Sequence, residues 1–133
     1  MDSRVLVVED SVELRDYLCD VLQGAGFEVV RAADGYEAMN ELRENPCSLV
    51  ILDLFMPGKD GFETLTELRT LSPRPKVLAV SGGGRFSAPD TLLVASRLGA
   101  DKALAKPFTP SEFLGAISEL HGLPSSVAAS QES

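Results

Sequence analysis

Short apolar runs of strand length alternate with stretches of helical apolar spacing along almost the whole chain. This alternation is typical of βαβ units that share a parallel sheet, and it argues against an all-β or an all-α domain. Strands that are apolar throughout are buried on both faces, so we expect helices on both sides of the sheet. The expected strands are Val5–Val8, Phe27–Ala32, Val50–Asp53, Lys76–Ser81 and Ala103–Ala105.

Helices are expected between and after these strands, and most carry a start or stop signal. The sequences Asp34-Gly35-Tyr36-Glu37 and Thr109-Pro110-Ser111-Glu112 have the form of capping boxes. The expected helices run from Ser11 to Gly24, from Asp34 to Asn45, onward from Gly61, from Asp90 to Gly99, and from Thr109 to Gly122. The expected core positions in them are Leu14, Leu18, Val21, Leu22, Ala38, Met39, Leu42, Phe62, Leu65, Leu68, Leu93, Ala95, Leu98, Phe113, Ile117 and Leu120.

The length of 133 residues predicts one domain over residues 1–123, and the small polar residues that follow predict a flexible tail over 124–133. A net charge of -8 argues against direct nucleic-acid binding, which needs a basic face. No apolar stretch reaches the roughly 20 residues of a membrane span, and no signal sequence follows Met1. We therefore expect a cytoplasmic protein without membrane insertion.

Cysteine and histidine are too sparse in this chain to suggest a site of their own. Cys19 and Cys47 cannot form a disulfide framework and are expected to be reduced, half-buried thiols. His121 stands alone near a helix end, so neither metal binding nor acid–base chemistry is expected there. No serine–histidine pair appears in the sequence, and Gly82-Gly83-Gly84 lacks the lysine of a phosphate-binding loop.

Polar side chains follow four of the expected strands at the point where each strand ends. Glu9 and Asp10 follow the first strand, Asp53 ends the third, and Ser81 and Lys106 end the fourth and fifth. The carboxyl ends of parallel strands meet at one edge of the sheet, which is where such proteins keep their sites. We therefore expect three carboxylates, a hydroxyl and an ammonium to converge, with Asp53 presented at the edge and not buried.

Three neighbouring carboxylates repel one another by roughly 4 kcal/mol per pair at about 4 Å and an effective dielectric constant near 20. A hard divalent cation such as Mg²⁺ would relieve this repulsion, whereas the chain offers no cysteine and histidine cluster for zinc. Asp53 beside such a cation can attack phosphorus and form an aspartyl phosphate, while Lys106 and Ser81 contact other phosphoryl oxygens. Taken singly, Glu9 and Asp10 are equally well an acidic helix start.

Five short motifs are arranged along the chain as in a known family. They are Val7-Val8-Glu9-Asp10, Asp53-Leu54-Phe55-Met56-Pro57-Gly58-Lys59-Asp60-Gly61, Ser81-Gly82, Gly99-Ala100-Asp101 and Lys106-Pro107-Phe108. In combination they resemble the receiver domain of two-component response regulators, from Arg4 to about Leu120. The resemblance implies a doubly wound five-stranded parallel sheet of order 2-1-3-4-5 with five flanking helices. It also implies Mg²⁺ bound by Glu9, Asp10, Asp53 and the backbone carbonyl of Phe55.

The resemblance further implies that Asp53 is phosphorylated by a sensor histidine kinase or a histidine phosphotransfer protein. Ser81 would then move toward the phosphoryl group, and the face made by the last two helices and the fifth strand would signal to a downstream protein target. Because only a short tail follows Leu120, the chain is similar to stand-alone receivers without an output domain. We expect a monomer at rest that is able to dimerise on activation.

Two features depart from the usual family pattern. Ala103 stands where the family usually carries an aromatic switch residue, and the connection 82–89 is long and rich in glycine, either as a partner-specific surface or as a neutral insertion. Phe55 and Gly83 lie two residues after Asp53 and Ser81, and neither side chain can orient an attacking water. Loss of the phosphoryl group by hydrolysis is therefore expected to be slow.

Other functions are compatible with parts of this pattern. A phosphorelay intermediate would return the phosphoryl group to a histidine on another protein. A phosphatase of the haloacid dehalogenase type would need a second acid two residues after the nucleophile, where this chain has Phe55. A phosphorylation-independent binding module would not need the five site residues. We expect no enzyme in the ordinary sense, only self-catalysed phosphotransfer and slow autodephosphorylation.

Overall fold

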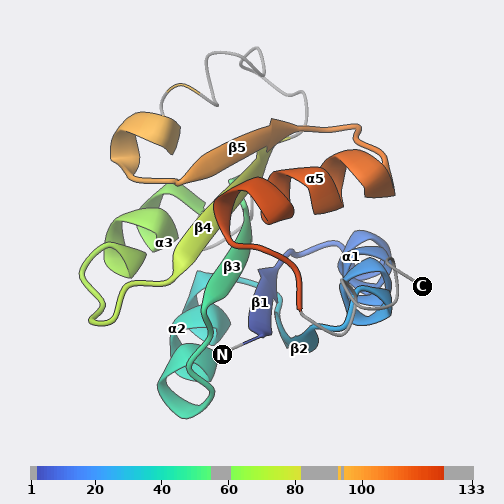
Figure 1. The fold of residues 1–133 in the computed structure, drawn as a ribbon. Helices are drawn as coiled ribbons and strands as arrows, with labels where there is room; N and C mark the ends of the chain where they lie inside the picture. Colours follow the sequence, from blue (N-terminus) through green and yellow to red (C-terminus); the bar gives the residue numbers. More distant parts are fainter. Residues whose placement is uncertain (1–2, 55–60, 82–92, 94, 125–133) are drawn as a thin grey trace.

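The structure is a computed structural model that describes residues 3–54, 61–81, 93 and 95–124. Five parallel strands form one sheet in the order β2-β1-β3-β4-β5, which confirms the expected topology. The strands are β1 (Arg4–Val8), β2 (Glu28–Ala32), β3 (Leu49–Asp53), β4 (Lys76–Ser81) and β5 (Lys102–Ala105). Each begins within one residue of the expectation. Figure 1 shows α1 (Val12–Gly24) and α5 (Pro110–Leu120) on one side of the sheet and α2 (Gly35–Glu44) and α3 (Gly61–Leu68) on the other.

The core consists of two layers, one on each face of the sheet. Successive strand residues point to opposite faces. In β1, Val5 and Val7 therefore pack with α1 and α5, while Leu6 and Val8 pack with α2 and α3. β3 is buried along its whole length, as expected for a central strand covered on both sides. Phe113 of α5 is the largest fully buried side chain among the residues that the structure describes.

Side-chain caps fix the starts of three helices, as the sequence predicts. Ser11 caps α1 by accepting a hydrogen bond from the Leu14 amide. Asp34 caps α2 through the Glu37 amide at 2.9 Å. At α5 the capping box is complete, because Thr109 Oγ1 accepts from the Glu112 amide and Glu112 Oε1 accepts from the Thr109 amide. These bonds satisfy amide groups that have no partner inside the helix.

The helix expected between β4 and β5 is described only at Leu93 and at residues 95–98, which are helical. Ala95 is buried and Leu98 packs against the core as expected, but Leu93 is 53% exposed, so its predicted core position is wrong. Residues two apart on a helix point to nearly opposite sides, so Leu93 and Ala95 cannot both face the sheet. The predicted start at Asp90, the connection 82–89 and the tail beyond Pro124 lie outside the described residues.

One expectation about a cysteine is wrong. Cys19 is completely buried in α1 and not half-buried, because it packs with Leu18 and Leu22 beneath the sheet; Cys47 is half-buried as expected. His121 makes two contacts that were not predicted: its Nε2 lies 2.7 Å from Ser48 Oγ, and its ring packs against Phe27. This serine–histidine pair joins residues 73 positions apart, which no local sequence motif can reveal.

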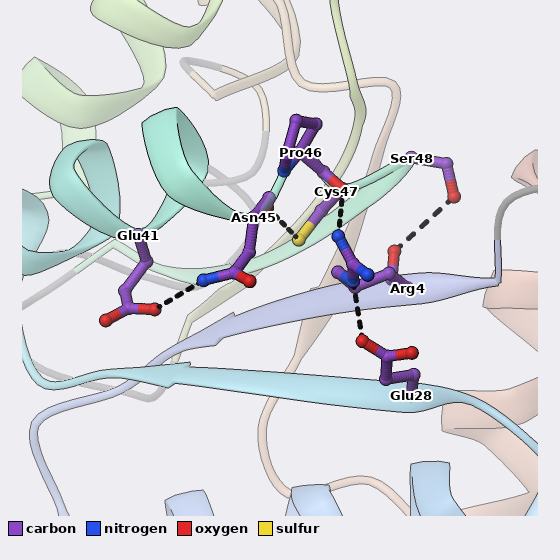
Figure 2. Close-up of polar contacts among 7 residues, drawn as sticks. All are labelled: Arg4, Glu28, Glu41, Asn45, Pro46, Cys47 and Ser48. Carbon is purple, nitrogen blue, oxygen red and sulfur yellow. Dashed lines mark hydrogen bonds and ion pairs between the residues drawn. The ribbon is translucent and has the colours of Figure 1, made fainter.

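The edge of the sheet opposite the expected site is tied together by polar contacts around Arg4 (Figure 2). The Arg4 guanidinium donates to Glu28 at 2.7 Å and to the Pro46 carbonyl at 3.3 Å. The Ser48 amide donates to the Arg4 carbonyl at 3.1 Å, and Ser48 Oγ lies 3.5 Å from the same oxygen. Cys47 Sγ contacts the Asn45 carbonyl at 3.1 Å. These bonds join the starts of β1, β2 and β3. None of the helices built from the described residues is long and apolar enough to span a membrane.

Candidate functional site

The carboxyl ends of β1 and β3 bring three acidic side chains together. Glu9 and Asp10 directly follow β1, and Asp53 is the last residue of the neighbouring β3. One carboxylate oxygen from each of the three lies within 4.8 Å of the others. The amide of Glu9 donates to Ala32 at the end of β2, which continues the strand ladder by one residue and holds Glu9 at this edge. The predicted convergence of the three acids is therefore present.

The three acids differ in their exposure to solvent. Glu9 is 2% exposed and Asp53 is 4% exposed, whereas Asp10 is exposed. The expectation that Asp53 is presented and not buried is wrong. Asp53 still belongs to the strand, pairs with Val80 of β4, and is followed by the completely buried Leu54. Packing on both sides of β3 continues past the carboxylate, so Asp10 is the open side of the cluster.

Lys106 supplies the positive charge at this edge. It follows β5, and its amide donates to the Ser81 carbonyl at 2.8 Å. Its Nζ donates to Glu9 Oε1 at 3.2 Å and lies 3.7 Å from Asp53 Oδ1. The side chain therefore reaches from β5 across β4 to the acids of β1 and β3. Its peptide bond to Pro107 is cis.

Ser81 is the last residue of β4 and is completely buried. It follows Val80, the pairing partner of Asp53, so the serine lies one position beyond Asp53 on the adjacent strand. The structure thus brings Glu9, Asp10, Asp53, Ser81 and Lys106 to the same edge of the sheet. Phe55, whose backbone carbonyl was expected to bind Mg²⁺, lies outside the described residues.

Burial and the Asp53 charge together raise the pKa of Glu9 to about 7. The Ser11 amide, which donates to Glu9 Oε2 at 3.1 Å, and the Lys106 ammonium act in the opposite direction. The protonated form is favoured because a buried carboxylate loses hydration and faces a second negative charge. Without a metal ion, keeping Glu9 ionised therefore destabilises the fold near neutral pH.

Arg15 is a site neighbour that sequence reasoning missed. Its Nη1 donates to the backbone carbonyl of Glu9 at 2.9 Å, so α1 holds the loop that carries the two acids. The available signal is local: Arg15 lies one helical turn after the capping residue Ser11, close enough to reach back to the preceding strand end.

The acidic cluster fits a hard divalent cation. Three carboxylates are converging oxygen ligands of the kind that Mg²⁺ takes, and the exposed Asp10 leaves one side open to water. Among the described residues, no histidine or cysteine belongs to this cluster, so the donor set does not suit zinc. Glu9, Asp10 and Asp53 would be the side chains that hold the ion.

Comparisons with known proteins agree with this geometry. The family model of the response regulator receiver domain matches residues 5–118. The chemotaxis protein CheY of Thermotoga maritima is 31% identical over 121 residues, which are 90% of this chain and 98% of that protein. The transcriptional regulatory protein CpxR homolog of Haemophilus influenzae is 36% identical over 115 residues, which are 86% of this chain. The chain spans only about half of that relative, 48% of its length.

Solved structures give the same result at the level of the fold. The chemotaxis protein CheY4 of Vibrio cholerae superimposes with a TM-score of 0.80 at 30% identity, over 90% of this chain and 99% of that one. A putative response regulator from Chloroflexus aurantiacus gives a TM-score of 0.81 at 30% identity, over 90% and 97% of the two chains. The matched residues 5–118 include the whole acidic edge, Ser81 and Lys106. This chain therefore belongs to the family of response regulator receiver domains.

Proposed function

We propose that Asp53 accepts a phosphoryl group in a Mg²⁺-dependent reaction and that the resulting change of shape signals to a partner protein. The donor would be the phosphohistidine of a sensor histidine kinase or of a histidine phosphotransfer protein. The observation that carries this proposal is the contact of Lys106 with both Asp53 and Glu9 inside the acidic cluster. A nucleophile, a cation and a set of metal ligands thus meet at one point.

In the proposed step, an Asp53 carboxylate oxygen attacks phosphorus and forms an O–P bond. The N–P bond to the donor imidazole breaks, and its electron pair stays on the imidazole nitrogen. Lys106 Nζ, already near Asp53 Oδ1, then interacts with a phosphoryl oxygen as a point charge. Mg²⁺, when bound, adds positive charge next to the transferring group. Positioning and electrostatics are most of what phosphoryl transfer requires.

Burial of Asp53 supports a long-lived product. Its side chain is nearly inaccessible, which limits the access of water to the acyl phosphate. We therefore propose self-catalysed phosphotransfer and slow autodephosphorylation, without turnover of a separate substrate. The roles of Phe55 and Gly83 in this lifetime remain predictions from the sequence.

Signalling would use the strands and helices connected to the site. Ser81 ends β4, and Lys106 bonds to its carbonyl, so a shift at the phosphoryl group acts directly on the β4–β5 edge. β5 is linked to α5 by the ion pair of Lys102 with Glu119 at 2.6 Å. We propose that the face that includes β5 and α5 changes on phosphorylation and contacts the downstream target. A cytoplasmic location, a resting monomer and dimerisation on activation are parts of the same proposal.

The test is intact-mass measurement after incubation with acetyl phosphate, with Mg²⁺ or with EDTA. The unsubstituted chain should gain one phosphoryl group only with Mg²⁺. Asp53→Asn should gain none, and the control Asp20→Asn, an exposed aspartate in α1, should behave like the unsubstituted chain. If Asp53→Asn gained the same mass as the unsubstituted chain, Asp53 would not be the phosphoacceptor.

A phosphorylated histidine phosphotransfer domain serves as the second donor. Absence of gain from both donors would reject the phosphoacceptor function and favour phosphorylation-independent binding. Return of the phosphoryl group from the phosphorylated chain to that domain would identify a phosphorelay intermediate in place of a terminal switch.

A further inference from the structure

Gly61, the first residue of α3, lies directly against the backbone of Asp53 and Leu54. Its amide donates to the Leu54 carbonyl at 3.3 Å, and the residue is buried. A Cβ added here would lie 2.9 Å from the carbonyl carbon of Leu54 and closer still to Leu54 Cα and the Asp53 carbonyl oxygen. All three are backbone atoms, so no side-chain rotation makes room for a methyl group.

The clash of an added Cβ with backbone atoms is not found at Gly24, Gly99 and Gly115. Gly99 has φ of +113°, and its added Cβ would meet the flexible Arg69 side chain, so glycine is needed there for conformation. Gly24 and Gly115 have nothing within 4 Å of an added Cβ. Gly61 does not have a positive φ, so only the close approach of two backbone segments requires glycine at this position.

The restricted backbone carries the proposed phosphoacceptor. On its other side, the Leu54 amide donates to the Val80 carbonyl of β4 at 3.1 Å, so the end of β3 is held between β4 and α3. Any displacement of Asp53 moves its carboxylate relative to Lys106, 3.7 Å away, and to the other two acids. Misplacement of a reacting group by about 1 Å can cost about a hundredfold in rate.

We infer that Gly61 is a positioning residue for the acidic site: its lack of a side chain lets α3 hold the Asp53–Leu54 backbone where the Asp53 carboxylate meets Glu9, Asp10 and Lys106. Its effect on phosphoryl transfer rests on the proposed function. Its effect on metal binding does not, because the cluster geometry alone requires it.

The experiment compares Gly61→Ala with two matched variants. Gly115→Ala adds the same methyl group in α5, where space is open. Gly99→Ala strains the backbone away from the acidic cluster and so controls for general loss of stability. For each variant we would measure Mg²⁺ affinity by calorimetry. The rate of phosphorylation would be followed over a range of acetyl phosphate concentrations, at a temperature where urea titration shows equal folded fractions.

Gly61→Ala should weaken Mg²⁺ binding at least threefold and lower the maximal phosphorylation rate at least tenfold, with little change in the half-saturating acetyl phosphate concentration. Gly115→Ala and Gly99→Ala should stay within twofold of the unsubstituted chain in both measurements. The inference would be overturned if Gly61→Ala had the same Mg²⁺ affinity and phosphorylation rate as the unsubstituted chain. It would also be overturned if Gly99→Ala lost as much Mg²⁺ affinity and rate as Gly61→Ala at the same folded fraction.

Gly61→Ala is also to be made in a background that carries Gly24→Ala and Gly115→Ala, because alanine stabilises helices at open positions. If Gly61→Ala does not fold in this stabilised background, amide hydrogen exchange of the unsubstituted protein tests the inference. Mg²⁺ should slow exchange of the Gly61 and Leu54 amides together and leave Gly115 unchanged; a Gly61 amide insensitive to Mg²⁺ would overturn the inference. If Gly61→Ala weakens Mg²⁺ binding but neither the unsubstituted chain nor any variant is phosphorylated, the inference about Gly61 is supported and the proposed function is rejected.

Discussion

Lys106 is the residue on which the charge balance of the site depends, because it contacts both buried acids. Lys106→Met should abolish detectable phosphorylation by acetyl phosphate on the time scale of the unsubstituted reaction. It should also bind Mg²⁺ more tightly, by about threefold or more at low salt, because a competing positive charge is removed. Calorimetry with Mg²⁺ and intact-mass kinetics measure the two effects.

Lys102→Met is the matched control for this substitution. Lys102 pairs with Glu119 of α5, away from the acidic cluster, so its loss should leave Mg²⁺ affinity unchanged. Weaker Mg²⁺ binding in Lys106→Met would contradict the view that the ammonium and the metal ion compete for the same carboxylates.

Glu9 should make the metal-free fold sensitive to pH. Its pKa near 7 in the folded protein lies above the ordinary value of 4.5, so the fold binds a proton that the unfolded chain releases between these values. The stability contributed by that proton is present at acidic pH and is lost as pH rises through about 7. In EDTA, the free energy of unfolding of Glu9→Gln should therefore exceed that of the unsubstituted chain by a margin that grows by about 2 kcal/mol from pH 5.5 to pH 8.

Urea titrations at the two pH values measure this difference. Glu44→Gln, at an exposed glutamate that ends α2, should show no such change with pH. The same Glu9→Gln protein should bind Mg²⁺ more weakly, because it loses a charged ligand. A stability gain that does not grow with pH would show that the Glu9 carboxylate is not the source of the repulsion.

Among the helices and strands, α5 has the best-defined start. The reciprocal bonds of Thr109 and Glu112 satisfy two amides, so Thr109→Ala should destabilise the protein by about 1 kcal/mol. Ser111→Ala changes an exposed hydroxyl in the same turn and should be nearly neutral. Urea titration compares them, and equal effects of the two substitutions would show that the capping box does not stabilise α5.

The other end of α5 is tied to the sheet by His121. Because the Gly122 carbonyl can only accept, His121 Nδ1 carries a hydrogen, and in the neutral ring Nε2 accepts from Ser48 Oγ. A double-mutant cycle with Ser48→Ala and His121→Phe should give a coupling energy of about 1 kcal/mol. Additive effects in urea titration would mean that the contact does not hold α5 against the start of β3.

For the whole molecule, binding of Mg²⁺ to the folded state should raise stability by mass action. At about 100 times its dissociation constant the ion should add about 2.7 kcal/mol. Asp10→Asn should lose most of this gain, whereas Glu13→Gln, which removes the same charge from the first turn of α1, should keep it. Thermal melts with MgCl₂, and with NaCl at equal ionic strength, measure the effect; equal gains in both salts would show that screening alone is responsible.

Most of the fold was predictable because it depends on local patterns. The apolar runs and helix caps are properties of short segments, and the bounds of β4 were predicted correctly. The error at Leu93 arose because a helix period over a short segment did not decide which face meets the sheet. The Ser48–His121 contact was missed because a hydrogen bond between segments remote in sequence has no signature in either one. The Arg15 bond to Glu9 was missed although the two residues are only six positions apart.

The sequence alone determined which polar side chains stand at the strand ends, because strand ends and residue types are local. It also predicted that these side chains meet, because parallel strands share one carboxyl edge. Tertiary structure decided how far each group is exposed and what it contacts. Asp53 is buried because β4 and α3 enclose the end of β3, and Lys106 reaches Glu9 because β5 and β1 lie on either side of β3 and β4. Such distances depend on the packing of segments remote in sequence, and that packing belongs to the folded molecule as a whole.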